Sequence, residues 1–192
     1  SIKTFDLYHS MSGSMPDIGI FVANWQEENV LRQMVIGNLK RIPYPSVKMF
    51  IGVYPNDEAT KDIALQLEKE FPDRVRVIVN TLDGPTSKGQ LLNEMFRQVF
   101  TGNNPPEMVV MHDSEDVIDA RTFDIYTKLY KEYDFIQTPV FSLDSRHRSY
   151  TAATYMDEFA EKHTRELVVR NALGAMVPSA GVGTCLTKKL IK

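Results

Sequence analysis

The chain has 192 residues, of which 43% are apolar and 24% are charged, and its formal net charge is −3. This length suits one domain with a substantial core, and the small negative charge provides no basic field that would recruit nucleic acid or anionic lipid. Cys185 is the only cysteine, which excludes an internal disulfide framework, suits a reducing cytosol and predicts a buried, unreactive thiol. No apolar run approaches the ~20 residues that a membrane-spanning helix needs.

Short apolar runs alternate along the chain with amphipathic segments. In chain order the pattern predicts a strand at 18–23, a helix at 26–39, a strand at 47–54, a helix at 57–71, a strand at 75–79, a helix at 87–100, a strand at 108–111, a helix at 121–132, a strand at 135–140 and a helix within 155–173. Strands that alternate with helices imply right-handed crossovers. We therefore predict an α/β fold with a mostly parallel sheet and helices on both faces, in one domain at 16–192 that follows a flexible arm at 1–15.

Polar side chains follow three of these predicted strands. Asn24, Tyr54 and Asp113 each come at or just after the end of an apolar run. Ligands of parallel α/β sheets bind beyond the carboxyl ends of the strands. The sequence therefore predicts a binding site at this edge of the sheet.

Three carboxylates stand within the four residues that follow the strand at 108–111 and its His112. In an extended segment Asp113 and Glu115 would point to the same side, and two carboxylates with free positions around them suit Mg²⁺ or Mn²⁺ held on a diphosphate. Asp116 is expected to cap the next turn or to support the two ligands. The alternative is a solvated acidic loop that only caps the next helix.

Two further segments have the composition of a phosphate or sugar site. Lys88 begins a predicted helix, where its charge opposes the helix dipole, and binding a phosphate would explain its position. The alternative is a lysine that simply faces solvent. The small residues at 178–184 would allow a ligand to approach the backbone closely, or they form an ordinary β-turn.

Several common motifs are absent from the sequence. Residues 84–89 lack the order of a Walker A loop, and 181–183 lack the third glycine and the surrounding strand and helix of a dinucleotide-binding turn. Ile118 occupies the position where an EF-hand needs glycine. The four histidines have no spacing typical of a zinc site.

Taken together, these segments resemble family-2 glycosyltransferases of the GT-A fold. The resemblance covers nearly all of residues 18–190 and is carried by IFVANWQEENVL at 20–31, GPTSKGQLLN at 84–93 and DSED at 113–116. Five spaced segments further resemble inner-membrane members of the family: GVYPND, DGPTSK, HDSEDVI, MDEFAE and PSAGVGT.

The resemblance implies a role for each matching residue. Mg²⁺ or Mn²⁺ would be held by Asp113 and Glu115, and Lys88 would approach the diphosphate. The nucleoside pocket would be lined by Ala23, Asn24 and Glu27, and the floor near the sugar or acceptor by Gly181, Val182, Gly183 and Thr184. The implied activity is an inverting transfer from a nucleotide-sugar, with a UDP-sugar favoured, to a glycan acceptor in exopolysaccharide synthesis. The implied location is the cytoplasmic face of the bacterial inner membrane, attached to a membrane-embedded remainder.

The sequence departs from the family pattern in two places. Most members have an aspartate at the end of the second strand to bind uracil, whereas this chain has Tyr54, which could stack on the base, and Asp57, which could bond to it. The family's general base follows the 178–184 segment, so we expect it beyond Lys192, with Asp157 and Glu158 as possible substitutes. Two other functions stay open: an inactive nucleotide-binding regulatory module and a nucleotidyltransferase, although the latter should have a glycine-rich loop after the first strand.

Overall fold

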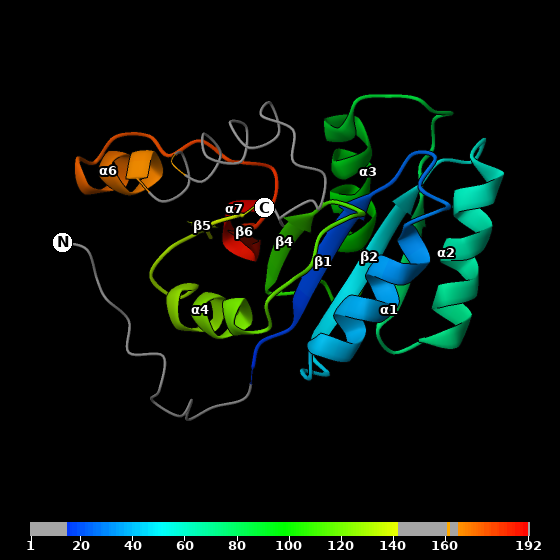
Figure 1. The fold of residues 1–192 in the computed structure, drawn as a ribbon, viewed down its shortest axis with the longest axis horizontal. Helices are drawn as coiled ribbons and strands as arrows, with labels where there is room; N and C mark the ends of the chain where they lie inside the picture. The colour runs from blue at the N-terminus through cyan, green and yellow to red at the C-terminus, as the bar shows by residue number, and fades with distance from the viewer. Residues whose placement is uncertain (1–14, 142–160, 162–164, 192) are drawn as a thin grey trace, which may run out of the picture.

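The computed structural model describes residues 15–141, 161 and 165–191, and these residues form a three-layered α/β fold (Figure 1). Its six-stranded sheet has the order β3-β2-β1-β4-β6-β5. The strands are β1 (Ile18–Ala23), β2 (Val47–Val53), β3 (Val75–Val79), β4 (Met108–His112), β5 (Phe135–Gln137) and β6 (Thr184–Thr187). The helices are α1 (Leu31–Arg41), α2 (Glu58–Glu70), α3 (Lys88–Phe100), α4 (Arg121–Leu129), α6 (Leu167–Ala172) and α7 (Lys188–Ile191).

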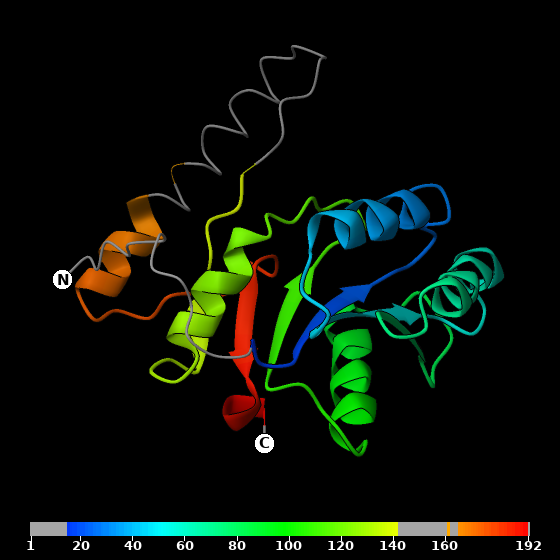
Figure 2. The same cartoon turned by 90° about the horizontal axis from the view of Figure 1, so that it is seen from below.

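The predicted fold class is confirmed. Strands β1 to β4 pair in parallel, and β6 runs antiparallel to both β4 and β5. Figure 2 shows α1 and α4 on one face of the sheet and α3 on the other. Each face has its own core because side chains alternate along the strands: Ile20 of β1 belongs to the core under α1, α2 and α4, whereas Phe21 belongs to the core under α3.

The first helix begins later than predicted. Residues 26–30 form a loop and α1 begins at Leu31. Gln26 has a positive φ of 57°, and its backbone N–H donates to Asp57 Oδ2 at 2.7 Å. The N–H of Glu27 donates to Thr60 Oγ1 at 3.0 Å. Contacts from the start of α2 therefore hold these residues as a loop at the carboxyl edge of the sheet.

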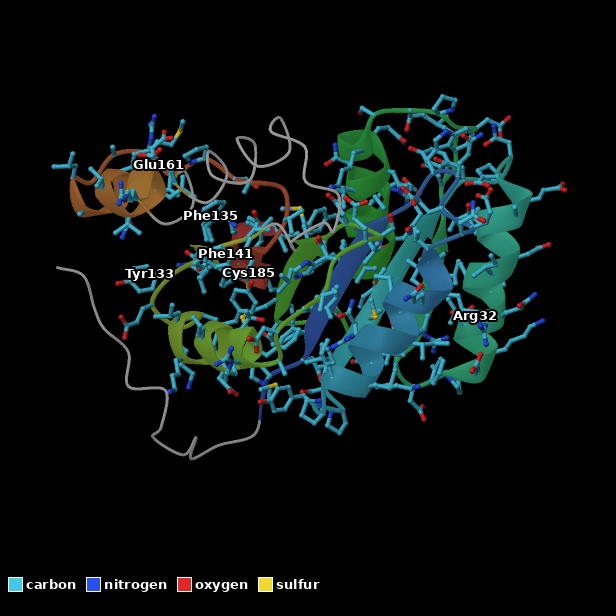
Figure 3. All side chains as sticks on the ribbon, viewed as in Figure 1. Arg32, Tyr133, Phe135, Phe141, Glu161 and Cys185 are labelled. Carbon is cyan, nitrogen blue, oxygen red and sulfur yellow. The ribbon has the colours of Figure 1, made fainter. Side chains whose placement is uncertain are left out.

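The strand β6 was not predicted. We expected only a turn at 178–184 in this part of the chain, whereas Thr184–Thr187 forms a strand that pairs with β4 and β5. Cys185, which lies within this part of the sheet (Figure 3), is fully buried, and burial raises the pKa of its thiol to about 12. The prediction of a buried cysteine is confirmed, and the raised pKa disfavours the thiolate that would make it reactive.

Two predicted segments lie partly outside the described residues. Of the helix expected within 155–173, α6 is the described α-helical part, and 155–160 and 162–164 are not described. Residues 1–14 of the predicted arm are also outside, while Met15 is half-buried and packs against the core under α1. Within the described ranges, no helix combines the length and the apolar character that crossing a bilayer requires.

Candidate active site

The carboxyl ends of β1, β2 and β4 lie together at one edge of the sheet, as predicted. The strands are in register, so that Ala23 is opposite Gly52 and Val22 is opposite His112. Antiparallel β6 begins at the same edge, because its Thr184 is opposite Met111 of β4. The segments that follow β1, β2 and β4 and the turn that precedes β6 therefore meet at one place.

The acidic segment after β4 is a closed turn. The backbone N–H of Asp116 donates to the carbonyl of Asp113 at 3.2 Å, and the Asp116 carboxylate accepts the N–H of Asp113 at 2.8 Å. The same carboxylate lies 3.0 Å from Nδ1 of His112. Asp116 thus supports the backbone that carries Asp113, as the sequence predicted.

Buried Asn38 of α1 fixes the other side of this turn. Its amide nitrogen donates to the carbonyl of Asp116 at 2.8 Å, and its Oδ1 accepts the N–H of Ile118 at 2.9 Å. Only 1% of Asn38 is exposed. A single buried side chain therefore satisfies one donor and one acceptor of the loop, which limits the positions that Asp113 can take.

The argument that placed Asp113 and Glu115 on the same side was wrong, because residues 113–116 form a turn and not an extended segment. The metal assignment itself stays a prediction. The Asp113 side chain is 39% exposed and Glu115 is exposed, so both carboxylates are accessible. Across the described residues, no group of three or more His, Cys, Asp or Glu side chains could hold a metal. Two oxygen ligands still suit Mg²⁺ or Mn²⁺, which commonly take their other ligands from water and substrate phosphates.

Lys88 at the start of α3 forms an ion pair with Asp113. Its Nζ contacts Oδ1 of Asp113, and both side chains are about two-fifths exposed, at 41% and 39%. Ser87 caps the helix by accepting the N–H of Gln90 at 3.2 Å. The structure thus brings together the two residues that the sequence assigned separately to the metal and to the diphosphate.

An aromatic cluster lies on the other side, beyond β1 and β2. The Trp25 and Tyr54 rings meet edge to face with their centroids 5.2 Å apart, and the Tyr54 hydroxyl is 2.7 Å from Thr86 Oγ1. A Cβ at Gly84 would lie 2.3 Å from a Trp25 ring carbon. Asn56 pairs with the backbone of Gly84 through two 2.7 Å hydrogen bonds. These contacts lock the 84–86 loop against the end of β2.

The other residues predicted to bind the nucleoside have mainly structural contacts. Asp57 is buried, and its two oxygens accept the N–H groups of Gln26 and Thr60, so it caps α2 and anchors the loop after β1. The Asn24 amide nitrogen donates to two backbone carbonyls, while its Oδ1 is buried without a partner among the described residues. Ala23 and Glu27 are half-buried in the same region.

The turn at 178–184 is attached to β4. The N–H of Gly183 donates to the carbonyl of Met111 at 2.9 Å. Gln137 holds the turn from β5: it donates to the carbonyl of Val182 and accepts from Thr184 Oγ1 and from the N–H of Ala180, over 2.7–3.0 Å. Gly183 has a φ of 65°, and a Cβ there would lie 2.8 Å from Thr138 Oγ1, so glycine is required.

Sequence reasoning missed several residues that shape this site. Asn38 and Gln137 have no local signal, because each acts on a loop far away in the chain. Trp25 could have been found, since the chain's one tryptophan directly follows Asn24 at a strand end. Asp157 and Glu158, the possible substitutes for the general base, lie outside the described residues.

The chain is similar in sequence to proteins of one known family. The sequence profile of a family described as "Glycosyltransferase like family 2" matches residues 16–192. Bacteriophage adsorption protein B of Escherichia coli (strain K12) is 33% identical over 178 residues, which cover 91% of this chain and 24% of that protein. The chain therefore spans about a quarter of the length of the curated relatives it matches.

Solved structures share the fold. Mannosyltransferase PcManGT from Pyrobaculum calidifontis, in complex with GDP-Man and Mn²⁺, superposes with a TM-score of 0.59 at 15% identity, covering 95% of this chain and 53% of that one. S. aureus TarS 1–349 gives a TM-score of 0.51 at 15% identity, covering 69% of this chain and 38% of that one.

Proposed function

The chain belongs to glycosyltransferase-like family 2, a family of enzymes, and from this membership we propose that it forms the donor-binding part of an inverting glycosyltransferase. The donor would be a nucleotide-sugar, with a UDP-sugar favoured, bound together with Mg²⁺ or Mn²⁺. The observation that carries the proposal is the meeting of the acidic turn, Lys88 and the 178–184 turn at one edge of the sheet. The Mn²⁺ and GDP-Man bound to the Pyrobaculum enzyme support this choice of ligands.

Different residues at this edge would bind the metal, the phosphate and the base of the donor. Asp113 and Glu115 would hold the metal, which when bound supplies positive charge beside the departing diphosphate. Lys88 would contact a phosphate from the start of α3, where backbone N–H groups also favour an anion. Tyr54 and Trp25 would present aromatic surface to the base, and Asn24 and Asp57 would keep the surrounding loops in place.

On the opposite side, Gly181, Val182, Gly183 and Thr184 would form the floor for the sugar or acceptor. A carboxylate base would remove the proton from the acceptor hydroxyl during direct displacement. We place this base beyond Lys192, as the family pattern implies. The acceptor would be a glycan at the cytoplasmic face of the inner membrane, and the name of the E. coli relative, a phage adsorption protein, supports a cell-surface polysaccharide as the product.

Donor binding can be tested by thermal shift and calorimetry with UDP-, GDP- and ADP-sugars, each with and without Mn²⁺. A ligand at 100 times its dissociation constant should stabilise the fold by about 2.7 kcal/mol. Asp113→Asn should abolish the Mn²⁺-dependent part of nucleotide binding and leave the melting temperature within a few degrees of the parent. Asp62→Asn, which alters an exposed aspartate of α2, serves as the matched control. Binding in Asp113→Asn that equals the parent's and still depends on Mn²⁺ would show that the metal assignment is wrong.

Transfer can be tested separately from binding. Sugar transfer by this chain should be at least ~10²-fold slower than by a version extended beyond Lys192, because loss of a general base typically costs 10²–10⁴-fold. Donor binding by the two should be the same. Equal transfer rates would place the base inside these residues, and Asp157 and Glu158 would be the first to replace. Binding without transfer by both versions would favour the inactive regulatory module.

A further inference from the structure

The ion pair between Lys88 and Asp113 uses the carboxylate that the metal would need. Nζ of Lys88 contacts Oδ1 of Asp113, and both side chains are partly open to solvent. An ammonium group so close to a carboxylate repels a divalent cation that approaches the same carboxylate. A metal ion arriving alone therefore has to displace Lys88 or bind beside an unfavourable positive charge.

The two partners of this ion pair are held very differently. The backbone of Asp113 is fixed by the carboxylate of Asp116, and the same turn is fixed by Asn38. The start of α3 is fixed by the Ser87 cap, whereas the four-carbon side chain of Lys88 extends from it into a partly exposed position. Lys88 can therefore move its charge while Asp113 stays in place.

A diphosphate would give Lys88 a new partner. Lysine commonly binds phosphate as a point charge, and no acidic side chain in the first turn of α3 competes for it. Once Lys88 turned to the phosphate, both oxygens of Asp113 would be available, and the diphosphate's negative charge would also attract the metal.

We propose that Lys88 is the internal counter-cation of Asp113, and that its transfer to the donor diphosphate makes metal and nucleotide bind cooperatively. This inference rests on the proposed function and adds a coupling between its two ligands. Because coupling is reciprocal, the metal should tighten nucleotide binding by the same factor as the nucleotide tightens metal binding. Lys88 thus weakens the binding of metal alone and strengthens the binding of the pair.

Lys88→Met should change the two affinities in opposite directions. Mn²⁺ alone should bind about three- to tenfold more tightly, because an ion pair and a repulsive charge are both removed. UDP or GDP in saturating Mn²⁺ should bind about tenfold or more weakly, because a charge-assisted hydrogen bond is lost. Lys88→Arg keeps the positive charge, so Mn²⁺ without nucleotide should bind to this variant as weakly as it binds to the parent.

The free Mn²⁺ signal in electron paramagnetic resonance measures metal binding, and calorimetry at constant ionic strength measures nucleotide binding. Lys48→Met is the matched control, because it removes the same charge from an exposed lysine in β2 near the opposite edge of the sheet. If Lys88→Met binds Mn²⁺ no more tightly than Lys48→Met while the parent still binds Mn²⁺ and nucleotide together, the coupling is wrong and the proposed function stands. If the parent binds neither UDP nor GDP with Mn²⁺, the coupling and the proposed function are both wrong.

Discussion

On the side of the site formed by β1, β2 and β4, the candidate residues lie at or after the ends of parallel strands or at the start of α3, and Asn24, Asp57 and Asp113 are held by contacts with a neighbouring strand or helix. On the side formed by β5 and β6, the 178–184 turn is held by three hydrogen bonds of Gln137, by Thr138 and Tyr126, which donate to the Gly183 carbonyl, and by the carbonyl of Met111, which accepts the Gly183 N–H. The first side contributes to both cores, whereas β5 and β6 are short strands of three and four residues that add Ile136 and Cys185 to one of them. The proposed donor half is therefore built into the centre of the fold, and the proposed acceptor floor is attached at its margin.

Asn38→Ala should have the largest effect on stability, because it breaks a buried clamp on the central side. The N–H of Ile118 and the carbonyl of Asp116 would lose their partner, at a cost of about 2–4 kcal/mol in unfolding free energy for the two. Mn²⁺-dependent nucleotide binding should also weaken, since the turn that carries Asp113 would loosen. Chemical denaturation and calorimetry measure the two effects. Gln33→Ala, an exposed position on the same helix, is the control. An equal loss of unfolding free energy in both variants would show that the two hydrogen bonds of Asn38 do not stabilise the turn.

Gln137→Ala tests the marginal side and should have a smaller, local effect. The Ala180 N–H, the Val182 carbonyl and the Thr184 hydroxyl would each lose a partner, but the pairing of β6 with β4 remains. We expect a loss of about 1–2 kcal/mol and faster hydrogen exchange at Gly183, with little change in β1.

Gln66→Ala on α2 controls for the loss of an exposed glutamine. Faster exchange throughout β1 and β4 in Gln137→Ala would show that the turn stabilises the whole sheet, and the contrast between the two sides would then be wrong.

The same contrast explains what the sequence could predict. The bounds of β1 and β3 were predicted correctly, because strands of a parallel sheet are short apolar runs. Asp57 and Ser87 were found at helix starts because capping is a local property. The bonds of Asn38 and Gln137 to these loops span 78–80 and 43–47 residues, and no local pattern encodes such partners.

Strand β6 was missed for a related reason. It has four residues, two of them buried threonines, so it lacks the apolar run that revealed the central strands. Its position is set by pairing with β4 and β5, which are distant in the chain. For the same reason the placement of the 178–184 turn against Met111 could be known only from the fold.

The smallest of the predicted effects concerns the charge of one carboxylate on α3, the helix that packs against β1 and β2. Glu94 of α3 is largely buried, and hydrogen bonds from Arg97 first and then from Gln98 lower its pKa from 4.5 to about 2. Gln98 also donates to the carbonyl of Val79, which ties this group to the end of β3. Because the folded pKa is depressed, the carboxylate's stabilisation is fully present above pH 4.5 and is lost as the pH falls towards 2.

Glu94→Gln should therefore lower the melting temperature by about 2 °C at pH 7, and the difference from the parent should shrink as the pH falls from 4.5 to 2. Glu70→Gln is the matched comparison, because its partner Arg32 (Figure 3) forms an exposed pair with it, with side chains 46% and 43% exposed. Exposed pairs of this kind contribute little, so Glu70→Gln should leave the melting temperature unchanged at both pH values. A deficit in Glu94→Gln that stayed constant down to pH 2 would mean that the shape and hydrogen bonds of the side chain stabilise α3, and that its charge does not.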